Sequence, residues 1–120
     1  MHITLRKPET EIKYQDWLNS PKDEACCFCR ELNSPTSIIK RRWEYWALMA
    51  NDYPYDKVFN QHDLLFSLRH VSWEDLTVKE VEEYNHILKK LKPGYHQLLE
   101  NVGDRISQKS HYHIHLARFI

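Results

Sequence analysis

The sequence predicts an α+β domain in which an antiparallel β-sheet packs against one main α-helix. Two observations carry this prediction. A single well-bounded amphipathic helix is expected at residues 78–91, and segments rich in β-branched and aromatic residues lie on both sides of it. The chain has 120 residues, which suits one domain with a substantial buried core.

The expected helix has clear start and stop signals. Thr77 and Glu80 have the spacing of a capping box, in which each side chain binds a free backbone N–H of the other residue. Pro93 and Gly94 end the helical pattern. The apolar face is expected to comprise Val78, Val81, Tyr84, Leu88 and Leu91.

The remaining elements are assigned from composition and turn signals. Residues 37–50 form one or two strands, because this stretch lies between an Asn-Ser-Pro turn and an Asn-Asp-Tyr-Pro turn. Residues 62–70 predict another strand, and two more are expected near 95–100 and 111–118. A short helix is expected around 11–19.

Composition and charge exclude several classes of protein. Lys plus Arg and Asp plus Glu number 17 each, so no extended nucleic-acid surface is indicated. Two glycines do not provide a phosphate-binding glycine-rich loop. No apolar run has the length of a signal peptide or a membrane span, which predicts a cytoplasmic protein without membrane contact. Three closely spaced cysteines then favour metal binding over a disulfide framework.

Three of the eight histidines alternate near the C-terminus. On a strand, His111, His113 and His115 share one face, and the outer two lie about 13 Å apart. One metal ion cannot easily bind all three, so the row serves at least two tasks or is simply a polar strand face. An unprotonated imidazole is also a good nucleophile at neutral pH, once a hydrogen bond to its second nitrogen orients the ring.

The stretch HYHIHLA resembles the histidine-triad (HIT) family of nucleotide hydrolases and transferases. Other stretches resemble the same family in the same order, over residues 26–118. They are Cys26-Cys27-Phe28-Cys29, Asn51-Asp52-Tyr53-Pro54-Tyr55, the segment from His62 to His70, and Asn101-Val102-Gly103. The resemblance implies a HIT-like domain at 26–120, preceded by an N-terminal extension at 1–25.

The resemblance also implies a structural zinc site. In zinc-containing relatives two thiolates and two imidazoles close a tetrahedron, which by position would be Cys26, Cys29, His70 and His111. The alternative is a reduced cysteine cluster with two unrelated histidines.

Catalytic roles follow from the same resemblance. His113 would attack the α-phosphorus of a nucleotide and form a covalent nucleotidyl-histidine, while His115 and His62 would donate hydrogen bonds to the phosphate. Asn51 would reach the nucleotide ribose and Asn101 the ribose or phosphate region, or each would serve only as a turn or capping residue. The segment before the triad lacks the glycine usual in the family, and its candidate phosphate donors are Ser107, Gln108 and Ser110.

We therefore expect a nucleotide hydrolase or nucleotidyl transferase that resembles the enzymes acting on dinucleoside polyphosphates or nucleoside phosphoramidates. The alternative is a non-catalytic module with the HIT fold, which binds nucleotides or serves as a zinc-stabilised interaction domain. The resemblance also implies a homodimer.

Overall fold

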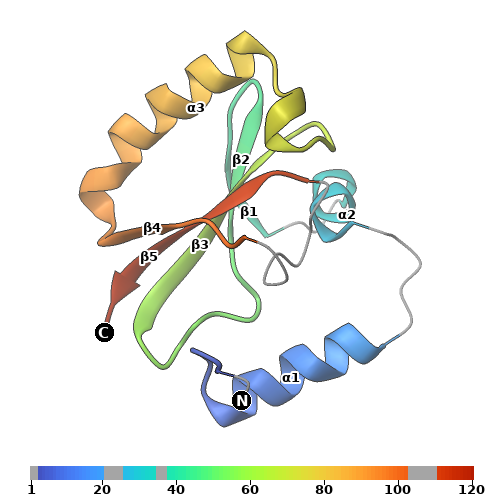
Figure 1. Cartoon of the computed structure of the whole chain (residues 1–120), viewed down its shortest axis with the longest axis vertical. Helices are drawn as coiled ribbons and strands as arrows, with labels where there is room; N and C mark the ends of the chain where they lie inside the picture. Colours follow the sequence, from blue (N-terminus) through green and yellow to red (C-terminus); the bar gives the residue numbers. More distant parts are fainter. Residues whose placement is uncertain (1–2, 21–25, 35–37, 103–110) are drawn as a thin grey trace.

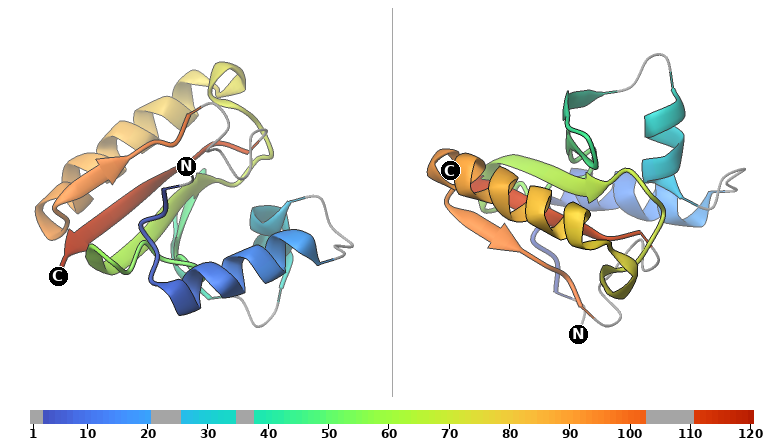
Figure 2. Two further views of the ribbon diagram at one scale, coloured as in Figure 1. Left: turned by 60° about the horizontal axis from the view of Figure 1, so that its bottom comes forward. Right: turned by 90° about the horizontal axis from the view of Figure 1, so that it is seen from above.

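The fold is built on one five-stranded antiparallel sheet with helices on both faces. The computed structural model describes residues 3–20, 26–34, 38–102 and 111–120. The strand order is β1-β2-β3-β5-β4, and every neighbouring pair is antiparallel. Figures 1 and 2 show α3 on one side of the sheet, with α2 and α1 on the other. The predicted α+β class is confirmed. The bounds are α1 Pro8–Asn19, α2 Cys27–Asn33, β1 Ile39–Arg42, β2 Trp46–Ala50, β3 Phe59–Ser67, α3 Val78–Leu91, β4 Gln97–Leu99 and β5 His113–Phe119, with 3-10 turns η1 Trp73–Asp75 and η2 Lys92–Gly94.

The two faces of the sheet carry separate hydrophobic cores, because alternate residues of each strand point to opposite sides. The α3 face is filled by Trp46, Leu48, Leu65, Ile87, Ile114 and Leu116. The α2 face is filled by Cys26, Phe28, Ala47, Met49, Leu64 and Phe66. In the central β3–β5 pair His113 lies opposite Phe66 and His115 opposite Leu64, so both histidines belong to the α2 face.

Helix α3 confirms the predicted boundaries. The Thr77 side chain accepts the backbone N–H of Glu80 at 3.2 Å, and the Glu80 carboxylate accepts the backbone N–H of Thr77 at 2.8 Å. The predicted apolar face was wrong at Val78, which is 74% exposed at the first turn. Ile87 is the fully buried apolar residue of the helix and lies against Trp46 and Leu65 in the core.

Several boundaries differ from the sequence prediction. The strand expected at 62–70 runs from Phe59 to Ser67, which leaves His70 in the turn that follows. Strand β5 begins at His113, so His111 precedes the ladder. Helix α2 was not predicted, because its seven residues are too few to show a helical period. Helix α1 was expected from residue 11 but begins at Pro8, where proline replaces an N–H that would have had no partner in the helix.

The N-terminal segment is joined to the loop before β3. The backbone N–H of Lys57 donates to the carbonyl of Leu5 at 3.0 Å. The Asp56 carboxylate accepts the backbone N–H of Lys7 at 2.7 Å and the Thr10 hydroxyl at 2.5 Å. These bonds attach α1 to the loop before β3. The division of the chain into an N-terminal extension at 1–25 and a domain at 26–120 stays a prediction. None of the described helices combines the length and apolar character that crossing a bilayer requires.

Candidate functional site

His113 lies at the start of β5 with one ring nitrogen occupied. Its Nδ1 donates to the backbone carbonyl of His111 at 3.0 Å. Burial lowers the pKa of His113, so the ring is neutral at pH 7 and carries its single proton on Nδ1. Nε2 is therefore left with a free lone pair, which is the protonation state that a nucleophile needs. The Phe28 ring, 4.8 Å away between centroids, packs against the imidazole and restricts its rotation.

His62 and His115 form a directed pair across the β3–β5 ladder. The backbone N–H of Tyr55 donates to Nδ1 of His62 at 3.0 Å, so the proton of the neutral His62 ring is on Nε2. Nε2 of His62 lies 2.7 Å from Nδ1 of His115 and donates to it. The proton of His115 is therefore on Nε2, and His115 presents an N–H donor beside His113.

Burial keeps both members of this pair neutral. It is the main cause that lowers the pKa of His62 to about 4, with the positive charge of Arg6 acting in the same direction. Burial, followed by His62, His113 and Arg6, lowers the pKa of His115 to about 3. At pH 7 each ring therefore holds one proton. The hydrogen bonds then run in one direction, from the Tyr55 N–H to His62 and from His62 to His115.

The two predicted asparagines lie beside these imidazoles. The Asn51 side-chain nitrogen is 3.4 Å from Nε2 of His62, a contact without a hydrogen bond because Nε2 carries the proton donated to His115, and the Asn51 side-chain oxygen accepts the backbone N–H of Tyr53 at 2.8 Å. The Asn101 side-chain nitrogen donates to the Tyr55 hydroxyl at 2.8 Å and lies 3.3 Å from Nε2 of His115, where two donors meet without a hydrogen bond in this tautomer. Asn51 therefore makes a turn and also reaches the site. The predicted phosphate donors Ser107, Gln108 and Ser110 lie outside the described residues.

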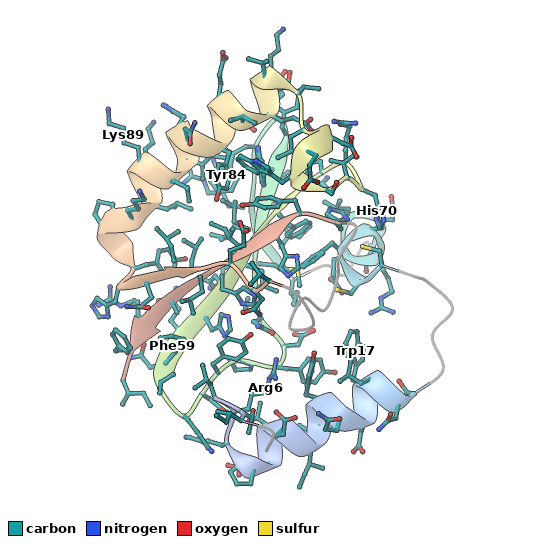
Figure 3. The ribbon with its side chains drawn as sticks, in the orientation of Figure 1. Arg6, Trp17, Phe59, His70, Tyr84 and Lys89 are labelled. Carbon is teal, nitrogen blue, oxygen red and sulfur yellow. The ribbon has the colours of Figure 1, made fainter. Side chains whose placement is uncertain are left out.

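The four predicted metal ligands converge at one end of the sheet. The ligand atoms of Cys26, Cys29, His70 and His111 all lie within 4.8 Å of one another. Nδ1 of His111 is 3.2 Å and 3.6 Å from the two sulfurs and 3.3 Å from Nδ1 of His70. Nδ1 of His70 is 3.3 Å from the Cys29 sulfur. Figure 3 shows His70 beside α2, the helix that carries Cys29.

The four individual distances are close to those expected around a tetrahedral ion. With metal–sulfur and metal–nitrogen bonds of about 2.3 and 2.0 Å, sulfur and nitrogen ligands lie about 3.5 Å apart and two nitrogens about 3.3 Å apart. Nε2 of His111 donates to the Ser67 carbonyl at 2.5 Å, which leaves Nδ1 unprotonated for a metal. The cluster can hold a metal ion, and four protein ligands would close its coordination. Cys27 is not part of it, and burial raises the pKa of this thiol to about 11.

A cavity of about 920 Å³ opens over His113 and His115. Helix α2 forms one wall through Cys27, Phe28, Arg30 and Glu31, and the N-terminal segment with α1 contributes Arg6, Tyr14 and Trp17. Arg6 was not predicted, because it lies outside the segments that resemble the HIT family. Tyr55 belongs to one of those segments but was assigned no role. It orients His62 through its backbone N–H, which sequence patterns do not reveal.

Comparison with known proteins supports the fold. No protein-family model and no curated protein matches the chain. A solved structure described as a Hit-like protein is 18% identical, with a TM-score of 0.56, over 76% of this chain and 94% of that chain. A HIT family hydrolase from Legionella pneumophila Philadelphia 1 is 20% identical, with a TM-score of 0.55, over 76% of this chain and 89% of that chain. The chain has a HIT-like fold.

Proposed function

We propose that the protein is a nucleotide hydrolase or nucleotidyl transferase that acts at the α-phosphate through His113. The observation that carries this proposal is the protonation state of His113, whose Nδ1 is bound to a carbonyl while Nε2 keeps its lone pair. Beside it the N–H of His115 provides a donor for a phosphate oxygen, and the cavity has room for a nucleotide. The class of reaction, hydrolysis, is proposed by analogy with the HIT family hydrolase from Legionella.

The proposed chemistry has two displacements. The lone pair of His113 Nε2 forms a bond to the α-phosphorus while the bond to the leaving group breaks and that group departs with the bonding electrons. A phosphate leaves as an anion, whereas an amine takes up a proton from solvent water as it leaves. Water, or another acceptor hydroxyl, then attacks the phosphorus and releases its proton to solvent water, and the nitrogen–phosphorus bond breaks to return the lone pair to His113.

The other site residues have supporting roles in this proposal. The N–H of His115 would stabilise the charge that grows on the phosphate oxygens. His62 would hold His115 in the required tautomer, because its own Nδ1 is committed to the Tyr55 N–H. Asn51 and Asn101 would bind the ribose or phosphate from either side, and the remaining predicted phosphate donors are Ser107, Gln108 and Ser110.

We further propose that the cysteine–histidine cluster holds a structural zinc ion. Two thiolates and two imidazoles are a usual ligand set for zinc, which would hold α2 against the start of β5. The homodimer and the cytoplasmic location implied at the sequence level stay predictions.

The test of the reaction is His113→Asn, with His86→Asn on the exposed side of α3 as the matched control. Turnover of a nucleoside phosphoramidate and of a dinucleoside polyphosphate should be abolished in His113→Asn and unchanged in the control. Intact-mass spectrometry after acid-free quenching should find a nucleotidyl adduct on the wild-type protein and none on His113→Asn. Near-normal turnover by His113→Asn would overturn the proposal, and nucleotide binding by a wild-type protein without turnover would favour the non-catalytic alternative.

A further inference from the structure

The N-terminal segment places a charged side chain, Arg6, in the wall of the cavity above the histidines. Among the described residues that this segment and α1 contribute to the cavity, Arg6 is the charged one. Its side chain is only 13% exposed, although arginine is usually at the surface. The backbone bonds of Leu5 and Lys7 to the loop before β3 fix the segment on both sides of it. Figure 3 shows Arg6 between α1 and the strands.

The guanidinium is held in place with part of its hydrogen-bonding capacity unused. Its Nε donates to the Tyr53 carbonyl at 2.7 Å, and Nη1 lies 3.5 Å from the Glu11 carboxylate. The guanidinium carbon is 3.8 Å from the centre of the Tyr14 ring. An arginine has five N–H donors, so its contacts with Tyr53, Glu11 and the Tyr14 side chain still leave donors available to a ligand. The Glu11 carboxylate also accepts hydrogen bonds from Thr4 and Gln15, so Arg6 is one of three partners that stabilise its charge.

Arg6 lies on the His115 side of the site and not on the His113 side. The guanidinium carbon is 5.0 Å from the Tyr55 ring centre, and the Tyr55 ring stacks on His115 at 5.5 Å between centroids. Consistent with this order, the charge of Arg6 contributes to the lowered pKa of His62 and His115, whereas the causes found for His113 do not include it.

The acidic residues that line the cavity are grouped with Arg30 of α2. Glu31 is on α2 and Asp52 follows β2, and both lie near the arginine on α2, Arg30. Burial is the main cause that raises the pKa of Asp52, with Glu31 acting in the same direction. Among the described residues that line the cavity, Arg6 is thus a positive charge without an acidic neighbour in the lining, although Glu11 pairs with it from outside the lining, whereas Arg30 lies in a cluster with Glu31 and Asp52. An anionic group of a ligand is best accommodated at Arg6.

We propose that Arg6 binds an anionic leaving group, so that the protein favours nucleotides in which a further phosphate follows the α-phosphate over those in which an amine follows it. The inference rests on the proposed function and specifies the substrate class of the same site. When the α-phosphorus is bound at His113 and one of its oxygens at His115, the group beyond His115 extends toward Tyr55 and Arg6. A departing phosphate gains negative charge there, and a fixed guanidinium stabilises it, whereas a departing amine gains nothing from the same contact.

The experiment compares two substrates that share a base, a dinucleoside tetraphosphate and a nucleoside 5′-phosphoramidate. Wild type, Arg6→Gln, Arg6→Lys and the matched control Lys13→Gln, which removes an exposed charge from α1, are assayed on both. Arg6→Gln should lower kcat/KM for the tetraphosphate about 10- to 100-fold, the scale of one charge-assisted hydrogen bond, and change the phosphoramidate value less than about threefold. Arg6→Lys should show a smaller loss, because it keeps the charge without the forked donors.

The outcomes separate this inference from the proposed function. An equal loss of kcat/KM on both substrates would show that Arg6 only supports the structure and would overturn the inference. No loss on either substrate would overturn it as well. Wild-type protein that hydrolyses only the phosphoramidate would refute the role of Arg6 and leave the proposed reaction intact, a readout that does not depend on the folding of any variant. Wild-type protein that turns over neither substrate would overturn both.

Discussion

Glu80 joins the start of α3 to the end of β3, and its replacement by glutamine should measurably destabilise the fold. Its side chain is 2% exposed, and its carboxylate accepts from Arg69 through Nη2 at 2.6 Å and through Nε at 3.1 Å. The same carboxylate accepts the backbone N–H of Thr77 at 2.8 Å. Arg69 directly precedes His70, so this ion pair also supports a residue of the metal cluster.

The magnitude follows from these contacts. Glu80→Gln keeps the size and one acceptor oxygen, removes the charge, and turns an NH₂ group toward the guanidinium donors. Hydrogen bonds to charged groups contribute about 1.5–3 kcal/mol each. Because the Arg69 side chain is 49% exposed and water screens the pair, we take about 2 kcal/mol for both bonds together. For 120 residues, with an unfolding entropy of about 2.1 cal/mol/K per residue, this corresponds to a fall in Tm of about 8 °C.

The effect should depend on pH in a defined direction. Hydrogen bonds from Arg69 are the main cause that holds the pKa of Glu80 below its usual value. A carboxylate with a lowered folded-state pKa stabilises the fold fully above the unfolded-state pKa of about 4.3, and this contribution is lost as pH falls through the folded-state pKa. The Tm difference between wild type and Glu80→Gln should therefore be full at pH 7 and shrink steadily below about pH 4.

Thermal unfolding followed by circular dichroism tests this reasoning. Glu82→Gln, an exposed carboxylate on the same helix, is the matched control and should change Tm by less than about 1 °C. Arg69→Met completes a double-mutant cycle in which the two losses should be strongly non-additive. A Tm difference that stays constant on acidification, or losses that simply add, would show that the ion pair does not provide the stability assigned to it.

Two further predictions concern the site. Cys29→Ser removes one of four ligands, so zinc content by elemental mass spectrometry should fall to near zero and Tm should fall with it, because metal-binding energy becomes folding energy. Cys27→Ser should keep the metal, and a Cys29→Ser protein with full zinc would contradict the assignment. His115→Asn should lower kcat about 10²- to 10³-fold with zinc content unchanged, the effect of one lost transition-state donor. A loss of less than about threefold would exclude the Nε2–H of His115 as that donor.

The elements predicted best from sequence are those whose signals are local. Helix α3 has its capping box and its Pro-Gly stop within 18 residues of chain, so its boundaries follow from neighbouring residues alone. Helix α2 has no comparable signal, because seven residues show no period and its stability comes from packing Phe28 against the sheet. The pairing of β5 between β3 and β4 is likewise a long-range choice that no single segment encodes.

The site divides in the same way. The strand period alone predicts that His113 and His115 share one face of the sheet, and the four candidate metal ligands were inferred from a resemblance that spans most of the chain. Patterns of side chains could not reveal that a backbone N–H of Tyr55 determines the tautomers of His62 and His115. Arg6 was missed for a different reason, since its place in the cavity depends on how the N-terminal segment attaches to the loop before β3.

The spacing of His111 and His113 along the chain links the candidate metal cluster to the proposed nucleophile. His111 directs Nδ1 to the cluster, and its backbone carbonyl accepts the Nδ1–H of His113, so one residue serves both. Cys26 and Cys29 lie on either side of Phe28, whose ring contacts Phe66 at 4.6 Å and His113 at 4.8 Å between centroids. A metal that binds both cysteines and His111 would therefore hold α2 against the start of β5 and keep Phe28 in contact with the imidazole of His113. In the proposed reaction such an ion would need no contact with the substrate, because it would act through the orientation of the neighbouring ring.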